Sequence, residues 1–435
     1  MTPAARLAAS IELLDEIEIS PRPADQVASL YFKSRRFIGS KDRRAVAEVV
    51  WRVLRRKARI DWWLAHLEFP IDARARVFAD LAFEGVALTS DMFQGAHSAP
   101  PPGKEEWKMM ERLKGKDIFH RDMPAWVKGE FPEWLQPRLE ALWGESMPRE
   151  VAAMRDEAPL DLRVNTLKAT RDEAMIALKK EGIAAEPTPL SPLGLRLKSR
   201  IALVQVQAWR DGLIEVQDEG SQLVAVLADA RPGQTVIDYC AGAGGKTLAL
   251  AAFMQNKGRL LACDVAEWRV DKAQERFRRN GVHNVTRRVI SGESDKWIKR
   301  SAASFDRVLV DAPCTGTGTW RRNPDAKWQL SETDLLELVV RQKDILESAS
   351  RLVKPGGRLI YATCSVMAEE NEQQVEAFLA AHPDYTVRPV PELWAELVGT
   401  ASPVTGPWLR LSPLTHGTDG FFTAVLERKG PESAA

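Results

Sequence analysis

The second half of the sequence predicts an α/β fold built on a doubly wound parallel sheet. From residue 216 to residue 430, apolar runs of strand length alternate with stretches of helix length. This alternation is typical of parallel strands joined by crossover helices. Three of the four cysteines also follow predicted strands, at the edge where such a sheet gathers its ligands.

The elements of this domain follow one another in a regular order. The first strand is followed by a glycine-rich loop and a helix, the second strand by a second helix, and the fourth strand by a long third helix. The strands are expected at 235–240, 259–264, 286–291, 306–313 and 357–364, with a closing strand at 423–429. The longer helices are expected at 246–255, 266–280 and 334–353.

Two smaller domains are expected before the sheet, since 435 residues exceed one ordinary core. Residues 1–145 predict an all-helical domain, in which a helix begins after Ser40 as N-cap and carries valines at helical spacing. Residues 146–215 predict a small α+β module, with strands at 161–168 and 194–198 around a helix at 171–183.

A basic run lies in the helical domain, although the formal net charge of the chain is only +1. Eleven basic residues stand there against two acidic ones, Asp42 and Glu48. A solvated helix surface explains such a run, and so do contacts with RNA phosphates. If phosphates are bound, RNA affinity should fall steeply with salt, which Arg43→Ala and Arg55→Ala variants would test. The basic residues are Lys33, Arg35, Arg36, Lys41, Arg43, Arg44, Arg52, Arg55, Arg56, Lys57 and Arg59.

The cysteines indicate a reduced compartment and free thiols. Cys240, Cys263, Cys314 and Cys364 show no spacing typical of a zinc site or a secreted disulfide framework. No histidine stands at metal-ligand spacing from them, so no metal is expected. The chain shows neither a signal peptide nor an apolar run long enough to span a membrane. We therefore expect a cytoplasmic monomer, with Cys263 an inert core residue.

The loop after the first strand favours a nucleoside cofactor. Its glycines let the backbone approach a ligand closely and offer N–H groups at the start of the next helix. Their spacing is neither that of the dinucleotide fingerprint nor that of the phosphate loop, which argues against hydride transfer. Asp264 ends the second strand, where a carboxylate either accepts hydrogen bonds from ribose hydroxyls or caps the following helix. The loop is Asp238-Tyr239-Cys240-Ala241-Gly242-Ala243-Gly244-Gly245-Lys246-Thr247.

Two strand-end motifs make the chain recognisable. DAPCTGTG begins at Asp311 and TCS begins at Thr363; together with DYCAGAGGKT they resemble the RsmB-like family of RNA cytosine-carbon-5 methyltransferases. QDEGSQL, RVNTLK and HGTDGFF resemble the same family, so the likeness spans about residues 160–429. The N-terminal helices, with RRFIGSKDRRAVAEVVWRVLRR, resemble the NusB-like RNA-binding domain of bacterial ribosomal RNA members.

The resemblance implies a class I, Rossmann-like methyltransferase domain that binds S-adenosylmethionine, an RRM-like module and an RNA substrate. Ribosomal RNA of the small subunit, 16S, is the first expectation, and transfer RNA is the alternative. The implied cofactor-binding residues are Cys240, Ala241, Gly242, Ala243, Gly244, Gly245, Lys246, Asp264, Glu293 and Asp311.

The chemistry of the implied reaction needs a nucleophile and a proton handler. Carbon 5 of cytosine becomes nucleophilic only after a thiolate adds at carbon 6. The residues alone do not choose between the two strand-end cysteines. The resemblance implies that Cys364 is the nucleophile, that Cys314 helps to release the product, and that Asp311 hydrogen-bonds the N3 side of the base.

The sequence departs from the family pattern at two places. Glu293 stands where the family usually has aspartate, and the glycine loop reads Ala-Gly-Ala-Gly-Gly rather than Ala-Ala-Pro-Gly-Gly. An amino-methyltransferase would carry an Asp/Asn-Pro-Pro-aromatic turn, which residues 311–314 are not. From another class, an inactive RNA-binding assembly factor with the same fold is the remaining alternative, and the intact cysteine pair counts against it.

Overall fold

A computed structural model describes residues 1–95, 97–199 and 201–430, and the chain forms two compact units. What we call the helical unit comprises Met1–Asp156 together with Trp320–Leu330. The sheet unit comprises Glu157–Thr319 and Ser331–Ala435. Among the described residues, no helix has the length and apolar character that crossing a membrane requires.

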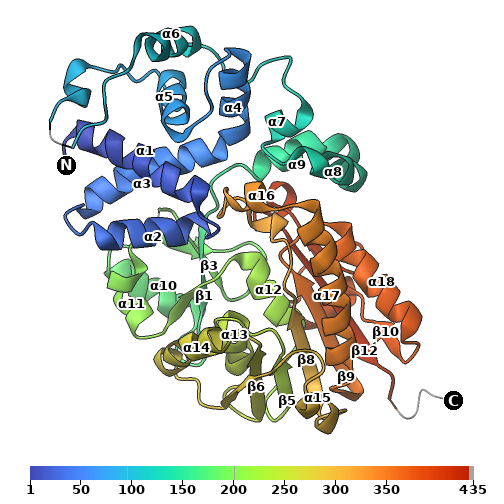
Figure 1. Cartoon of the computed structure of the whole chain (residues 1–435). Helices are drawn as coiled ribbons and strands as arrows, with labels where there is room; N and C mark the ends of the chain where they lie inside the picture. Colours follow the sequence, from blue (N-terminus) through green and yellow to red (C-terminus); the bar gives the residue numbers. More distant parts are fainter. Residues whose placement is uncertain (96, 200, 431–435) are drawn as a thin grey trace. The chain divides into compact units, whose positions relative to one another are not determined.

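The main sheet of the sheet unit confirms the expected fold class. Its strand order is β10-β12-β9-β8-β5-β6-β7, and β11 pairs with β12. The strands from β5 to β9 run parallel, while β12 is antiparallel to β9 (Figure 1). The chain order reverses between β5 and β8, which makes that edge a topological switch point. The strands are β5 (Thr235–Asp238), β6 (Arg259–Asp264), β7 (Val285–Val289), β8 (Phe305–Asp311), β9 (Val353–Thr363), β10 (Tyr385–Val387), β11 (Leu409–Leu411) and β12 (Phe421–Arg428).

Helices cover both faces of this sheet, because its strands are apolar on both sides. Val236 and Leu260 pack in one core cluster, and the next residues along the same strands, Ile237 and Leu261, pack in the other. The first face carries α12 (Glu219–Leu227), α13 (Gly245–Phe253), α14 (Glu267–Asn280) and α19 (Val390–Leu397). The second carries α15 (Lys296–Arg300), α17 (Glu332–Ser350) and α18 (Glu372–Ala381), and α20 (Pro413–His416) precedes β12.

A second, antiparallel sheet forms the α+β module that precedes the main sheet. Its order is β2-β3-β1-β4, and Leu162, Leu178 and Leu195 are fully buried in its core. The helix of the module begins at a capping box between Thr170 and Glu173. The elements are β1 (Leu160–Val164), α10 (Arg171–Lys180), β2 (Ala185–Pro187), β3 (Gly194–Leu197), α11 (Gln207–Arg210) and β4 (Ile214–Val216).

The helical unit has its own core, to which α3 (Ser40–Arg55) contributes Val46, Val50 and Val53. The expectation that Ser40 is the N-cap was wrong by one residue, because Gly39 caps this helix and Ser40 is its first residue. The other helices are α1 (Pro3–Ile19), α2 (Ala24–Ser34), α4 (Lys57–His66), α5 (Ala73–Phe83), α6 (Lys104–Leu113), α7 (Ala125–Gly129), α8 (Gln136–Trp143), α9 (Met147–Ala153) and α16 (Ala326–Gln329).

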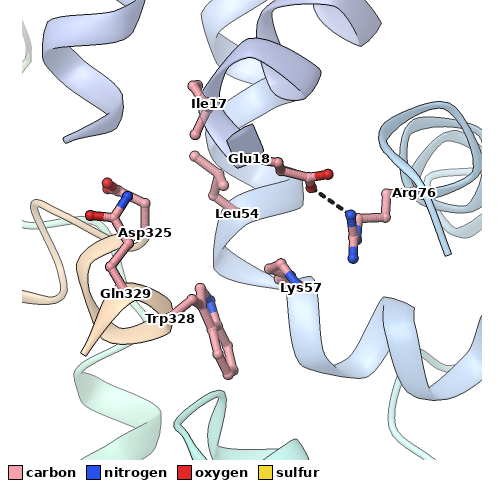
Figure 2. Close-up of a pocket in the computed structure, with 8 residues that line it drawn as sticks. All are labelled: Ile17, Glu18, Leu54, Lys57, Arg76, Asp325, Trp328 and Gln329. Atoms are coloured by element: carbon pink, nitrogen blue, oxygen red, sulfur yellow. Dashed lines mark hydrogen bonds and ion pairs between the residues drawn. The ribbon is translucent and has the colours of Figure 1, made fainter. Parts of the chain in front are cut away.

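The segment Trp320–Leu330, which includes α16, joins the helical unit although it lies between β8 and α17 in the sequence. The buried Asp325 carboxylate accepts a hydrogen bond of 2.8 Å from the backbone N–H of Ala24, and Trp328 packs against the helical core. The segment also forms one wall of a cavity of about 290 Å³ inside the helical unit (Figure 2). None of the predicted catalytic or cofactor-binding residues lines this cavity. The lining residues are Ile17, Glu18, Leu54, Lys57, Arg76, Asp325, Trp328 and Gln329.

Candidate active site

The predicted site residues of the sheet unit gather at the carboxyl ends of the parallel strands. Asp238 ends β5, Asp264 ends β6 and Asp311 ends β8. Asp238 pairs in register with Ala262 on β6, and Asp311 with Ala362 on β9. Because neighbouring parallel strands end at the same edge, the loops that follow them converge there.

Cys314 and Cys364 face each other at this edge, with their Sγ atoms 3.5 Å apart. They come from the loops after β8 and β9, which start level with each other because Asp311 stands opposite Ala362. The hydrogen bond to the Cys364 thiol, and then burial, raise the pKa of the Cys314 thiol well above its ordinary value. Cys314 is therefore protonated near neutral pH.

A fully buried carboxylate, Glu370, ties the Cys314 loop to the helices behind it. Its Oε1 accepts hydrogen bonds from the Thr315 backbone N–H at 2.8 Å and from the Gln342 side-chain amide at 2.9 Å. Its Oε2 accepts from the Thr315 hydroxyl at 2.5 Å. The Gln342 amide also donates to the carbonyl of Pro313. This network fixes the backbone on both sides of Cys314.

A second network joins the two cysteine loops to each other. The hydroxyls of Thr317 and Ser365 lie 3.0 Å apart, and the Thr317 hydroxyl accepts a hydrogen bond from the Val366 N–H. The Asn371 side chain donates to the Ser365 carbonyl, and the Gly318 N–H donates to the Cys364 carbonyl. Sequence reasoning missed Glu370 and Asn371, because neither belongs to a strand-end motif.

Lys246, at the start of α13, forms an ion pair with Asp311, and the Nζ–Oδ2 distance is 2.6 Å. Burial alone would lower the pKa of Lys246, but the Asp311 carboxylate outweighs burial and the pKa is raised. The Nζ atom also lies 5.6 Å from the centre of the Phe421 ring. The pair therefore places a charged ammonium and a carboxylate beside the cysteine loops.

The glycine loop takes a left-handed turn into α13. Gly244 has φ 78° and caps the helix, and a Cβ there would lie 2.7 Å from the Phe277 ring, so only glycine fits. Asp264 holds this loop, since its Oδ2 accepts from the Gly242 N–H at 2.8 Å. Its Oδ1 accepts from the Ala266 N–H at 2.9 Å, but Ala266 is itself the N-cap of α14 and no side chain caps that helix, so the alternative prediction that Asp264 caps it was wrong.

The α+β module supports the same loop through Arg163, of the RVNTLK motif. The buried guanidinium donates to the Gly245 carbonyl at 2.7 Å and to the Gln217 side chain. Burial lowers the pKa of Arg163 to about 10. At the other side of the loop, Arg276 of α14 donates to the Ala243 carbonyl at 2.7 Å, and the Ala241 N–H donates to the Cys263 carbonyl.

The closing HGTDGFF motif packs against the Cys314 loop. Gly318 and Gly420 touch backbone to backbone, and the Gly420 N–H donates to the Gly318 carbonyl at 2.9 Å. A Cβ on Gly318 would lie 2.1 Å from the Gly420 carbonyl oxygen. Both glycines are therefore required by close approach, which explains why these two motifs occur together.

Acidic groups surround Cys240 at the end of β5. Burial, and then the charges of Asp238, Asp311, Asp264 and Glu293, raise the pKa of the Cys240 thiol well above its ordinary value. Burial also raises the pKa of Asp238 to about 7, and its Oδ1 is buried without a hydrogen-bond partner among the described residues. Sequence reasoning gave Asp238 no role, although its place at the end of the first strand was a signal.

Glu293 lies in the loop after β7, where its backbone carbonyl accepts a hydrogen bond of 2.7 Å from the Ser348 hydroxyl. Its partly exposed carboxylate makes no hydrogen bond or ion pair within residues 1–95, 97–199 and 201–430. Cys263 is fully buried in the core, and burial raises its pKa to about 12. Over the same residues, no group of three histidine, cysteine or acidic side chains is arranged to hold a metal.

Comparisons with known proteins agree with the motifs. The family described as 16S rRNA methyltransferase RsmB/F matches residues 225–427, and the RsmF/B-like ferredoxin-like domain matches residues 131–204. A relative named probable ribosomal RNA small subunit methyltransferase B, from Synechocystis sp., is 31% identical over 89% of this chain and 91% of its own length. A second, from Photorhabdus laumondii, is 29% identical over 91% of this chain and 93% of its own.

Solved structures extend the likeness to three dimensions. The crystal structure of PH0851 has a TM-score of 0.79 and 27% identity, and the match covers 98% of this chain and 99% of that one. A methyltransferase homologue from Pyrococcus horikoshii has a TM-score of 0.60 and 31% identity over 70% of this chain and 97% of its own. The chain thus belongs to the RsmB/F family of methyltransferases, as its strand-end motifs predict.

Proposed function

We propose that this protein transfers a methyl group from S-adenosylmethionine to carbon 5 of a cytosine in 16S ribosomal RNA, through a covalent adduct with Cys364. Membership of the family confirms the expected cofactor. The relatives named ribosomal RNA small subunit methyltransferase B support the substrate class. The observation that carries the proposal is the cysteine pair, 3.5 Å apart, at the same sheet edge as the Lys246–Asp311 ion pair.

The loops at the strand ends fit the cofactor. The residues from Cys240 to Lys246 would wrap its methionine end, Asp264 would hold the ribose, and Glu293 would reach the adenine. The unpartnered Oδ1 of Asp238 and the free carboxylate of Glu293 are acceptors that suit the ammonium and the N–H groups of such a ligand. When bound, the cofactor supplies an electrophilic methyl group.

The roles of the two cysteines are those that the family resemblance implies, and their contact supports them. Cys364 adds to carbon 6 of the base as a thiolate. The negative charge that develops at ring N3 is neutralised by a proton from the Lys246–Asp311 pair, and Asp311 stays hydrogen-bonded to the resulting N3–H. Cys314 starts as a protonated thiol, chiefly because Cys364 stands next to it. Once Cys364 is bonded to carbon, that cause disappears and the pKa of Cys314 falls. Cys314 can then help to remove the proton from carbon 5 and release the product.

The remaining parts of the proposal concern the whole chain. Residues 1–145 act as a NusB-like RNA-binding domain, residues 146–215 as an RRM-like module, and residues 216–430 as the methyltransferase domain. The protein works as a cytoplasmic monomer without a metal. Transfer RNA is the alternative substrate, and an inactive assembly factor is the alternative outside the enzyme class.

The deciding experiment uses S-adenosylmethionine with a labelled methyl group and separated ribosomal and transfer RNAs that lack the modification. After digestion, the labelled nucleoside is identified by chromatography and mass spectrometry. We expect label in 5-methylcytidine from 16S ribosomal RNA. Label only in transfer RNA would overturn the substrate, and label in another nucleoside would overturn the reaction. Cofactor binding without any transfer to RNA or to assembling subunits would favour the assembly factor.

A further inference from the structure

The basic run of the helical unit divides into two classes once its contacts are known. Seven of its cations bind acceptors of the helical unit itself. Arg52 and Arg56 hold the buried Asp80, for example, and Arg59 holds the fully buried Glu130. These side chains already have acceptors within the helical unit, and their contacts stabilise its fold. The others in this class are Arg35 on Glu12 and Glu16, Arg43 on the Ile38 carbonyl, Arg55 on the Arg155 carbonyl, and Lys57 on Asp61.

The other four cations lie together around the turn between α2 and α3. Lys33, Arg36, Lys41 and Arg44 are all exposed, and none forms an ion pair or a hydrogen bond through its side chain within the described part of the chain. Phe37 lies in their midst with 76% of its surface exposed. We call these five residues the basic-aromatic patch.

The turn that carries the patch is fixed by its own contacts. Ile38 is 1% exposed and anchors the turn in the helical core, while its N–H donates to the Arg35 carbonyl at 3.0 Å. Arg43 donates to the Ile38 carbonyl at 2.7 Å from the following helix. Phe37, next to this anchor, is therefore held outward by a structured turn, so little ordering entropy opposes a contact with its ring.

The acidic residues of the run do not neutralise the patch. Asp42 is buried, and its Oδ1 accepts from the Arg6 guanidinium at 2.7 Å. Glu48 is exposed one turn beyond Arg44 and is the nearest competing carboxylate in the helix. Four cations around an exposed ring favour a polyanion that also offers flat apolar faces, which is the chemistry of an unpaired RNA nucleotide and its neighbouring phosphates.

We propose that the basic-aromatic patch binds single-stranded RNA, with one unpaired base stacked on Phe37 and the flanking phosphates on Lys33, Arg36, Lys41 and Arg44. The proposal rests on the RNA methyltransferase function proposed above and adds a substrate-binding site to it. A continuous duplex cannot use the ring, because its bases are already stacked on one another. The patch therefore selects a loop, bulge or end.

The first experiment tests the charges with a matched control. Full-length protein is titrated with a single-stranded 12-nucleotide RNA at several salt concentrations. The variant Arg36→Ser/Lys41→Ser is compared with Lys104→Ser/Arg112→Ser, which removes two exposed cations from α6, among acidic neighbours. Each lost phosphate contact should reduce the slope of log affinity against log salt by about 0.7. We expect a decrease of about 1.4 in the patch variant only, and equal slopes in both variants would overturn the proposal.

The second experiment tests the stacked base. Phe37→Leu keeps an apolar side chain and removes the ring, while Phe37→Trp keeps a ring. We expect Phe37→Leu to weaken binding of the single strand roughly tenfold and Phe37→Trp to preserve it, with no change for a 12-base-pair duplex. A 2-aminopurine base in the single strand should lose fluorescence with wild type and not with Phe37→Leu. Equal binding by the two Phe37 variants would overturn stacking.

The experiments distinguish a patch that does not bind RNA from a protein that does not methylate RNA. If the patch only binds RNA, Phe37→Leu and Arg36→Ser/Lys41→Ser raise KM for RNA and leave kcat unchanged. A fall in kcat at saturating RNA in these variants would contradict a pure binding role. If the protein methylates no RNA, the binding and fluorescence measurements still test the patch by themselves.

Discussion

Glu130 of the helical unit and Glu370 of the sheet unit are both fully buried, and each accepts several hydrogen bonds from a neighbouring segment. Glu130 receives the N–H groups of Ala58 and Arg59 at the start of α4, and also the Arg59 guanidinium. Glu370 receives groups from Thr315 and Gln342, next to a cysteine. A buried glutamate that accepts several hydrogen bonds thus holds the start of a helix in one unit and the Cys314 loop in the other.

This comparison shows that burial of a charge does not by itself mark a functional site. In the helical unit, Asp80 is completely buried yet satisfied by two arginines. In the sheet unit, Asp238 is buried with one oxygen unpartnered among the described residues. What separates the two regions is whether the buried groups already have all their partners. The following predictions test that distinction.

The largest effect is expected at the two thiols. Cys364→Ala should lower methyl transfer at least 10³-fold and form no covalent protein–RNA adduct, because the nucleophile is lost. Cys314→Ala should accumulate that adduct, seen as a shifted band in a denaturing gel. Thermal unfolding should change little in both variants, since both side chains are partly exposed. An adduct that persists in Cys364→Ala would reverse the assignment.

The second prediction compares the two buried glutamates directly. Glu130→Ala should destabilise the helical unit by about 3–5 kcal/mol, because it leaves Arg59 buried without its partner, and kcat should not change. Glu370→Ala leaves donors of Thr315 and Gln342 unsatisfied and should cost about 3 kcal/mol in the sheet unit. It should also lower kcat, as Cys314 loses its support. Denaturant unfolding and steady-state kinetics of both variants check this, and equal effects on kcat would refute the distinction.

The third prediction concerns pH. The folded-state pKa of Asp238 is about 7, above its ordinary value of 3.8, so the folded protein binds this proton more tightly than the unfolded chain does. The contribution of Asp238 to stability should therefore fall by about 2–4 kcal/mol as the pH rises from about 4 to about 7. Glu84 in the helical unit behaves oppositely, because its hydrogen bond with Arg56 lowers its pKa, and its contribution is lost as the pH falls below about 4.5.

Unfolding free energies measured from pH 5 to pH 8 for wild type and Asp238→Asn check this sign. The unfolding free energy of Asp238→Asn minus that of wild type should rise with pH. Wild type loses stability as Asp238 ionises, whereas asparagine does not titrate. A difference that stays constant across this range would mean that Asp238 is ionised throughout.

The smallest effect is expected at the contact between the two motif glycines. Gly318→Ala should cost about 1–3 kcal/mol, because its Cβ would overlap the Gly420 carbonyl and push the Cys314 loop aside. Gly430→Ala is a suitable control, since a Cβ there has no atom within 4 Å. Activity should fall with Gly318→Ala and not with the control. Unchanged kinetics for Gly318→Ala would show that the loop adapts without moving the thiol.

The sequence predicts the sheet unit well because its signals are local. The strand-end motifs around Asp311 and Cys364 place both cysteines at one edge, and the structure brings their sulfurs into contact. The register of β8 and β9, with Asp311 opposite Ala362, makes the two loops start at the same level. The family comparison then agrees with the same motifs.

What the sequence does not reveal depends on partners far along the chain. Glu370 sits in an ordinary helical turn, and only the fold shows that it faces Thr315, 55 residues earlier. The basic run looks uniform, but the acceptors that divide it, such as Asp80 and Glu130, lie 24 to 71 residues away from the cations that they bind. Charge in sequence therefore shows how many cations exist, and the tertiary contacts decide which of them face solvent.

The placement of Trp320–Leu330 in the helical unit has a consequence for synthesis on the ribosome. The last preceding residue of this unit, Asp156, is made 164 residues before Trp320. At roughly 5–20 residues per second, that interval lasts about 8–30 s. During this time the N–H of Ala24 lacks its Asp325 acceptor and the core lacks the Trp328 ring. The nascent helical unit is thus incomplete until most of the sheet unit has been translated, which makes its maturation a late event although its helices emerge first.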